Sequence, residues 1–360
     1  GGMEFKDYVP PDGIYTTHPN IEKVEFFDEK GNLLNQNTKN FLYGKKLKIK
    51  VTTKDVEDEK LIQVCLQGKS NRMNQKFKSI KEFQWWIAVK NNQLETPLFA
   101  LNLCWYNDDF ENYDYETYKT KIEETNLNEF YAKASLNAED VYLPLAGERL
   151  KPIAYKRNYE ELIGLFNKDN SGEKDLVDSW ENDFIRENNR IKTIVDEFID
   201  FINSTLNTPE KDEDIIKQIK SRVAEDAKHL WDAAIQQVQT EKNLDDRPLY
   251  WARNKMQTYL KRHPLFYDDI DFDLSTVKSN TKQLANIITL FEEKSRNYTG
   301  VDFSKAPVGT KKVLITGFDP FILNSFDNPN ITGNILQSNP SGCVALSLHN
   351  QKLGNGFIQA

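Results

Sequence analysis

The chain has 360 residues, of which 39% are hydrophobic and 12% aromatic, and its length predicts two or three domains. Its formal net charge of −8 is spread along the sequence, which argues against nucleic-acid binding, because that binding depends on clustered Lys and Arg. No stretch reaches the roughly 18 consecutive apolar residues of a membrane span, so we expect none.

The first part of the chain has the pattern of a β-sandwich. We assign residues 1–20 to an N-terminal tail and residues 21–152 to a β-sandwich region. Apolar and polar residues alternate over 47–52 and again over 62–66, the period-two pattern of half-buried strands. Further strand-like runs occupy 84–89, 97–106, 129–136 and 140–145. Short strands separated by turns favour an antiparallel sandwich of one or two immunoglobulin-like (Ig-like) modules.

Residues 153–298 change to helical periodicity, and we assign them to an α-helical bundle. Helix starts are inferred from Ser or Thr caps and from prolines in the first turn. The expected helices are a short one over 158–166, a long one containing Phe184, Ile191 and Phe198, and three that begin near Thr208–Glu210, at Pro248 and after Ser275–Thr276. Residues 299–310 are expected to form a linker.

The C-terminal segment, residues 311–360, has the pattern of an incomplete α/β domain. The largely apolar run Lys312–Thr316 predicts a buried parallel strand, and it leads into a Gly-Phe-Asp-Pro-Phe turn at 317–321. Such a turn lies at the carboxyl edge of a sheet, where α/β folds bind ligands. Ser341 is the expected cap of a short helix, and Gly356–Gln359 is expected to begin a second strand.

The block Val313–Phe321, followed by Asn339-Pro340-Ser341, resembles the N-terminal block of the pyroglutamyl peptidase I family, peptidase family C15. The resemblance covers residues 311–360 only. It implies a flavodoxin-like cysteine peptidase, an omega peptidase that removes N-terminal pyroglutamate, in which Phe318 and Phe321 line the substrate pocket. This chain departs from the family by having Ile322-Leu323 in place of two glycines, and by a longer gap before Asn339.

The family's catalytic Glu, Cys and His lie downstream of this block, so no catalytic residue is assigned here. Cys343 is too early to be the nucleophile. His349, six residues further on, would not share a helical face with it. We therefore expect a chain truncated within its peptidase domain, with the native protein continuing beyond Ala360. A vestigial domain that ends there is the alternative.

Three other patterns suggest binding sites. Residues 167–178 resemble an EF-hand loop, but Asn167 and Asp178 replace the usual first Asp and last Glu, so a capped turn explains them equally well. The acidic residues of 268–273 suggest either a metal site or a charged loop before a helix. The aromatic pairs Trp85-Trp86 and Trp105-Tyr106 suggest either sugar stacking or core packing. We predict no metal site and no cofactor.

The cysteines and the first residues of the chain indicate the cellular compartment in which the protein is made. Cys65, Cys104 and Cys343 form neither a disulfide framework nor a metal-binding spacing. Gly1–Lys6 lacks the pattern of a signal peptide. We expect synthesis in a reducing cytoplasm, and export by a Sec-independent route stays open.

Two functional hypotheses follow. In the first, the sandwich and bundle are accessory or docking regions of a multidomain bacterial protein, a secreted or injected effector, whose C-terminal domain is a peptidase-like hydrolase. In the second, the chain is a non-enzymatic interaction protein that binds a protein partner or a glycan. The protein partners expected are a secretion apparatus, an immunity protein or the rest of the same chain.

Overall fold

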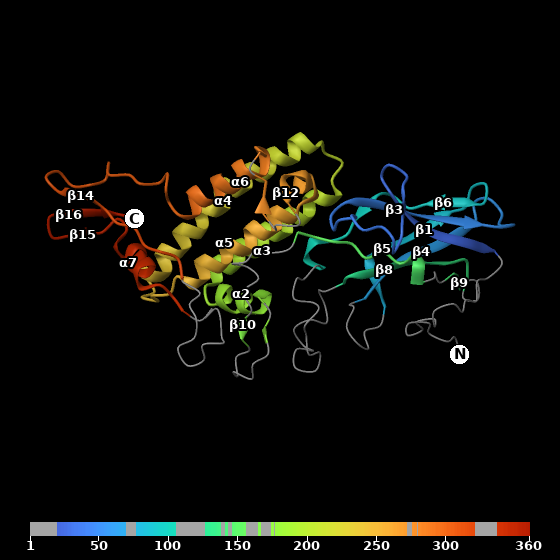
Figure 1. The fold of residues 1–360 in the computed structure, drawn as a ribbon, viewed down its shortest axis with the longest axis horizontal. Coiled ribbons are helices and arrows are strands. Elements are labelled where there is room, and N and C mark those ends of the chain that lie inside the picture. Colours follow the sequence, from blue (N-terminus) through green and yellow to red (C-terminus); the bar gives the residue numbers. More distant parts are fainter. Residues whose placement is uncertain are drawn as a thin grey trace. The chain divides into compact units, whose positions relative to one another are not determined.

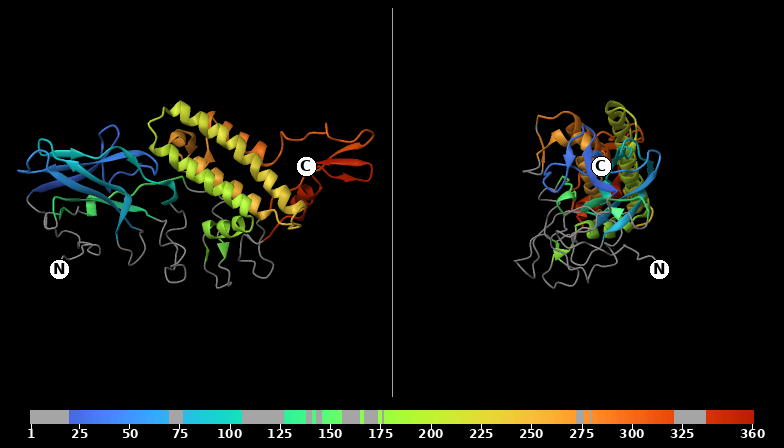
Figure 2. Two further views of the ribbon diagram at one scale, coloured as in Figure 1. Left: turned by 180° about the vertical axis from the view of Figure 1, so that it is seen from behind. Right: turned by 90° about the vertical axis from the view of Figure 1, so that its right-hand side faces the viewer.

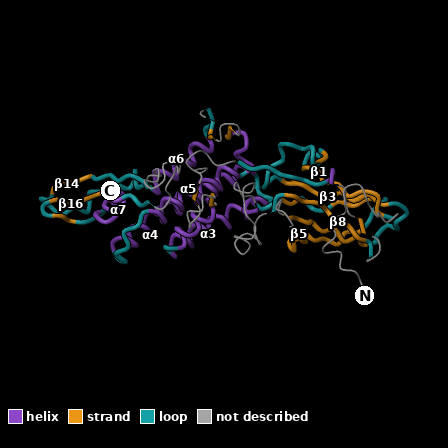
Figure 3. Tube along the Cα trace, turned by 60° about the horizontal axis from the view of Figure 1, so that its bottom comes forward, coloured by secondary structure: helices purple, strands orange, loops and turns teal. Residues whose placement is uncertain are grey.

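The computed structural model describes residues 20–69, 77–105, 127–137, 141–142, 146–155, 165–166, 174–175, 177–271, 276–278, 280–320 and 337–360. The chain divides into two compact units. The first comprises the residues up to Ala154 with Leu206–Thr208, and the second comprises Tyr155–Thr205 and Pro209–Ala360. Strands dominate the first unit and helices the second, so the predicted mixed α+β composition is confirmed (Figure 3).

Two antiparallel sheets make up the first unit. One has the order β2-β1-β3-β6, with β7 also paired to β3, and the other has the order β5-β4-β8-β9. Their strands are β1 (Ile21–Asp28), β2 (Leu33–Leu34), β3 (Lys46–Thr53), β4 (Leu61–Lys69), β5 (Lys78–Ala88), β6 (Gln93–Glu95), β7 (Phe99–Ala100), β8 (Glu129–Ser135) and β9 (Val141–Tyr142). Strand β1 also contacts β8 and β9 of the other sheet. The immunoglobulin-like assignment stays a prediction.

Strand β3 lies between β1 and β6 in its sheet, and its residues alternate between buried and half-buried positions. Leu47, Ile49 and Val51 are fully buried, whereas Lys48 and Lys50 are half-buried on the opposite face. Burying one face of a strand fixes its register, because a shift of one residue would expose every apolar side chain. The period-two prediction for this segment is confirmed by the burial pattern.

The second unit is built mainly of helices that pack side by side (Figures 1 and 2). They are α2 (Val177–Arg186), α3 (Asn189–Ser204), α4 (Asp212–Gln239), α5 (Arg247–Arg262) and α6 (Gln283–Ser295). Helix α4 contacts α3 and α6, and α5 contacts α2 and α3. Their apolar stripes meet in a core whose fully buried members include Phe198, Ile219, Val223, Leu230, Ala252, Met256, Ile287 and Phe291. Within the described residues, no helix combines the length and apolarity that crossing a bilayer requires.

The long helix predicted through Phe184, Ile191 and Phe198 is two helices, so that expectation is wrong. The break lies at Asn188, whose side-chain oxygen accepts hydrogen bonds from the backbone N–H groups of Arg190 and Ile191. An Asn cap satisfies N–H groups that the first turn of a helix leaves without partners. The apolar stripe continues across the break, which is why spacing alone predicted one rod.

The end of one expected helix and the start of another also differ from the prediction. Leu165–Phe166, expected to end a short helix, form strand β10 with its partner β11 (Lys174–Asp175), and residues 158–164 lie outside the described part. Thr276–Val277, expected to start a helix, form β13 with β12 (Ile270–Asp271), so α6 begins only at Gln283. Helix α4 begins at Asp212, shortly after the proline signal. In the first two cases the backbone pairs as a short strand in place of the expected helix.

The C-terminal segment contains a three-stranded sheet of order β14-β16-β15 and helix α7. Its elements are β14 (Lys311–Leu314), α7 (Pro340–Leu348), β15 (Lys352–Leu353) and β16 (Gly356–Gln359). Strands β14 and β16 are parallel, which agrees with the predicted second strand, and α7 packs on α4.

Two expectations for this segment are wrong. Strand β14 was expected to be buried, but it is an edge strand in this sheet and Leu314 is 58% exposed. Lys311 and Lys312 are exposed as well and Val313 is half-buried, so neither face of this strand is enclosed. The cap of α7 is Asn339 rather than Ser341, because the side chain of Asn339 accepts the hydrogen bond from the Ser341 N–H.

Asn188→Ala should lower the free energy of unfolding of the helical unit by about 1–3 kcal/mol. The substitution removes the α3 cap and a buried hydrogen bond of 2.6 Å from Asn188 Nδ2 to Gln237 Oε1. Urea denaturation followed by circular dichroism measures the change. Asn189→Ala is the matched control, since Asn189 is exposed, and it should change stability by less than about 0.5 kcal/mol. Equal effects of the two substitutions would contradict the capping account.

Candidate functional site

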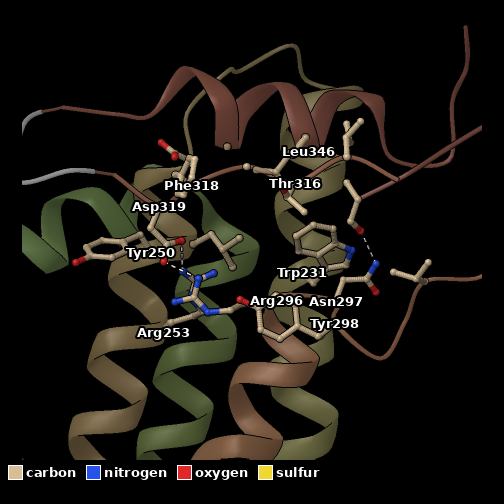
Figure 4. A pocket seen from close by; sticks show the side chains of 18 of the residues that line it. Trp231, Tyr250, Arg253, Arg296, Asn297, Tyr298, Thr316, Phe318, Asp319 and Leu346 are labelled. Atoms are coloured by element: carbon tan, nitrogen blue, oxygen red, sulfur yellow. Dashed lines mark hydrogen bonds and ion pairs between the residues drawn. The ribbon is translucent and has the colours of Figure 1, made fainter. Parts of the chain in front are cut away.

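A cavity of about 230 Å³ lies in the second unit, where helices α4, α5 and α6 meet the segment after β14 and helix α7 (Figure 4). Its apolar wall includes Trp231, Leu249, Tyr250, Leu314 and Leu346. Its charged residues are Asp246, Arg253, Arg296 and Asp319. A concave apolar site with a few converging polar groups is the usual form of a binding site.

Asp319 is held by two arginines from the helical region. Arg253 of α5, whose side chain is 5% exposed, donates through Nη2 to Asp319 Oδ1, as Figure 4 shows. Arg296, just after α6, lies 2.6 Å through Nη1 from Asp319 Oδ2. Arg296 also pairs with Glu292. The two guanidinium groups therefore bind both oxygens of one carboxylate.

These contacts set the charge states of Asp319 and Arg296. Burial alone would raise the pKa of Asp319, but Arg253 and Arg296 overcome that effect and hold its pKa below the usual range. Burial alone would lower the pKa of Arg296, but Asp319 and Glu292 raise it. Asp319 is therefore an anion at neutral pH, and the ion pairs are fully charged.

Two glycines allow the backbone of residues 317–320, here called the bend, to lie against the start of α7. A Cβ atom on Gly317 would lie 2.6 Å from the Ser341 carbonyl oxygen and 2.7 Å from the Gly342 Cα. A Cβ atom on Gly342 would lie 2.7 Å from the Phe318 carbonyl oxygen. Because these neighbours are backbone atoms that cannot easily move, both positions require glycine.

Hydrogen bonds connect the bend to the α7 cap. Asn339 Nδ2 donates to the Asp319 carbonyl oxygen over 2.9 Å. The Phe318 N–H donates to Ser341 Oγ over 3.0 Å, and Ser341 Oγ donates to Asn339 Oδ1 over 2.8 Å. The Asn339-Pro340-Ser341 sequence therefore caps the helix and fixes the bend at the same time.

Asp246, at the N-terminus of α5, joins the same contact. Its carboxylate accepts from the Asn339 N–H over 3.1 Å and is 5% exposed. Burial raises the pKa of Asp246 to about 6, and the neighbouring charges of Asp245 and Asp319 act in the same direction. The α5 start thus contributes a titratable group to the wall of the cavity.

Cys343 and His349 lie in different surroundings. Burial, followed by the charge of Asp246, raises the pKa of the Cys343 thiol to about 11, so it is protonated at neutral pH. His349 Nδ1 accepts from the Ala360 N–H over 3.2 Å, and its ring packs edge-on against Trp231. Burial lowers the pKa of His349. We assign no reaction to either residue.

Of the two residues that the family resemblance assigned to substrate binding, Phe318 lines the cavity and Phe321 lies outside the described residues. Phe318 is 68% exposed, so it stands at the cavity's edge. The sequence interpretation missed Trp231, Arg253 and Arg296, which the helices contribute. One signal for Arg253 existed, since a charged residue on the apolar stripe between Leu249 and Met256 requires a buried partner.

The remaining sequence patterns have these outcomes. Asp269 Oδ2 accepts the Leu284 N–H at the first turn of α6, which fits the charged-loop interpretation of 268–273. Most of the EF-hand-like segment 167–178 lies outside the described residues. The described part of the chain contains no group of three or more His, Cys, Asp or Glu placed to hold a metal ion. Trp85 packs against Phe83 and Phe99, whereas Trp86 is 64% exposed.

Comparison with known proteins gives one match. Residues 177–267 are similar to a family described as the PA0049 N-terminal domain. The matched range spans α2, α3, α4 and α5, and it contains the cavity residues Trp231, Asp246 and Arg253. It covers less than half of the chain and excludes the bend. No curated protein and no solved structure matches the chain.

Asp246 predicts a pH dependence of stability. A carboxyl whose pKa is higher in the folded protein binds its proton more tightly there, so its contribution is greatest below the unfolded value of 3.8. That contribution is lost as the pH rises to about 6. Asp319 acts in the opposite sense, and its stabilising contribution is lost only as the pH falls below about 4.

Asp246→Asn removes this titration while keeping a side-chain acceptor for the Asn339 N–H. The stability of the variant relative to wild type should therefore rise by about 1–3 kcal/mol between pH 4 and pH 7. Urea unfolding at a series of pH values measures it. Asp200→Asn, which removes an exposed carboxylate of α3, should give a nearly constant difference over this range. A constant difference for Asp246→Asn as well would show that burial does not raise its pKa.

Proposed function

We propose that the helical unit is an accessory docking region that holds the C-terminal α/β segment, residues 311–360, by its bend. The segment itself we propose to be the start of a pyroglutamyl-peptidase-like cysteine peptidase domain, on the resemblance of Val313–Phe321 and Asn339-Pro340-Ser341. The observation that carries the docking proposal is the pairing of Asp319 with both Arg253 and Arg296. In this arrangement the helices position the loop that the resemblance assigns to the substrate.

The burial of Arg253 increases the free energy that is lost when the docking contact is broken. A hydrogen bond to a charged group contributes about 1.5–3 kcal/mol, and a buried charge that loses its partner costs more. Arg253 is almost fully buried, so separating it from Asp319 would leave a desolvated cation in the helical region. The bend is therefore more stable against the helices than free of them.

The same contact suggests a role for the whole protein. An accessory region that binds the substrate loop of a hydrolase can support or regulate that hydrolase. We propose this role within a secreted or injected bacterial effector. The partner of the docking region is then the rest of its own chain, with a secretion apparatus or an immunity protein as alternatives. No catalysis is proposed for the residues present.

A second candidate function is partner binding by the first unit without enzymatic activity. The observation in its favour is Trp86, whose side chain is 64% exposed on strand β5 while its neighbour Trp85 is packed. Exposed tryptophan is enriched where proteins bind other proteins or sugars. Loss of binding to a protein or glycan array after Trp86→Ala would favour this candidate.

Asp319→Asn tests the docking proposal. The substitution keeps the size of the side chain but removes the charge that binds Arg253 and Arg296, so the bend should detach from the helices more often. Hydrogen exchange is followed by mass spectrometry. The backbone amides of 311–318 and 340–348 should then exchange at least about ten times faster than in the wild-type protein. Exchange in the core of α4 should stay unchanged.

Asp302→Asn is the matched control, because it makes the same substitution in the preceding segment. The Asp302 carboxylate bonds only locally, to the Ser304 N–H and hydroxyl. The Asp302→Asn substitution should leave hydrogen exchange in 311–318 and 340–348 at the wild-type rate. Unchanged exchange in the Asp319→Asn protein would mean that the ion pairs do not hold the segment, and the docking proposal would be abandoned.

A further inference from the structure

Exposed apolar side chains gather around the cavity. Tyr298, Val301, Leu314 and Phe318 all line it, and they are 66%, 38%, 58% and 68% exposed. Contiguous exposed apolar surface beside a concavity is typical of a binding site. The cavity volume of about 230 Å³ is below the about 300–1,000 Å³ of sites for drug-sized ligands, so its occupant is small.

The charges in the wall compensate one another. Among the residues that line the cavity, Arg253 and Arg296 carry two positive charges, and Asp319 and Asp246 supply two carboxyl groups. Glu292, which pairs with Arg296, does not line the cavity. A ligand anion would meet these carboxylates, and a ligand cation would meet the guanidinium groups. The wall therefore favours an occupant without net charge.

The wall also offers hydrogen-bond donors. A guanidinium carries five N–H donors, and the Arg253 side chain bonds to Asp319 through Nη2. Trp231 is 8% exposed, and its Nε1–H is buried without an acceptor among the described residues. Because Nε1 of Trp231 is not accessible to water, we assign the donor role to Arg253.

We propose that the cavity binds an uncharged molecule that combines one apolar side chain with a carbonyl oxygen, about the size of a single capped amino-acid residue. The apolar group lies against Leu249, Tyr250 and Leu314. The carbonyl oxygen accepts from Arg253. The proposal rests on the docked position of the bend, which forms one wall, and it names the class of ligand for that position.

Three probes that share the same side chain test the proposal. They are N-acetyl-leucine amide, which is neutral, N-acetyl-leucine, which is anionic, and leucine amide, which is cationic. Binding to the full chain is followed by protein-observed NMR. We expect the neutral probe to bind about tenfold or more tightly than either charged probe. Equal or tighter binding of a charged probe, or no binding of the neutral probe at tens of millimolar, overturns the proposal.

Paired leucine variants locate the site. Leu314→Lys should weaken binding of the neutral probe about tenfold or more, because it places a cation in the apolar wall. Leu353→Lys is the matched control, since Leu353 is 65% exposed on β15 of the same sheet and does not line the cavity. It should leave binding unchanged. An equal loss for the two variants would place the probe elsewhere and contradict the proposal.

The two proposals fail in different ways. Probe binding is measured on the wild-type chain, whereas docking is measured by hydrogen exchange in the Asp319→Asn variant. If exchange does not respond to Asp319→Asn but the neutral probe binds selectively, the ion pairs are not what holds the bend, and the ligand class stands. If exchange responds as expected and the neutral probe does not bind, docking stands and the ligand class is wrong.

Discussion

The position of the C-terminal segment depends on one carboxylate. Asp319 receives Arg253 from α5 and Arg296 from the end of α6, and Asn339 binds its backbone carbonyl. Glycines at 317 and 342 bring the two backbones close enough for these contacts to form. Without the carboxylate, the buried Arg253 would have to lose its charge partner or expose itself to water. The same segment supplies part of the cavity wall, through residues 314–319.

The docking residues come from two parts of the chain, and the family match covers only one of them. Arg253, Asp246 and Trp231 lie within the range similar to the PA0049 N-terminal domain family. Asp319 and Asn339 lie outside it, in the segment that we propose to be the start of a peptidase domain. On that proposal, the ion pairs join the family-matched helices to the start of a hydrolase domain. The proposed ligand would then bind where the two parts meet, within a single compact unit.

The sequence predicted the parts of the fold that local patterns control. Alternation located β3, proline located the start of α5, and the apolar run before Gly317 located β14. It failed where tertiary contacts decide the outcome. The Asn188 cap divides a continuous apolar stripe, and the pairing of Thr276–Val277 delays α6. Phe318, which the resemblance assigned to substrate binding, lines the cavity, and its role in binding stays a prediction. Arg296 was not predictable, because its partner Asp319 is distant in sequence and nothing local marks the pair.

A double-mutant cycle between Arg253 and Asp319 tests the central claim most directly. The free energy of opening of residues 311–318, obtained from hydrogen exchange, is compared among wild type, Arg253→Met, Asp319→Asn and the double variant. If this ion pair holds the bend, the losses of the single variants should not add, and the coupling energy should be about 1–3 kcal/mol. Losses that add to within about 0.5 kcal/mol would contradict the account, since the two residues would then act independently.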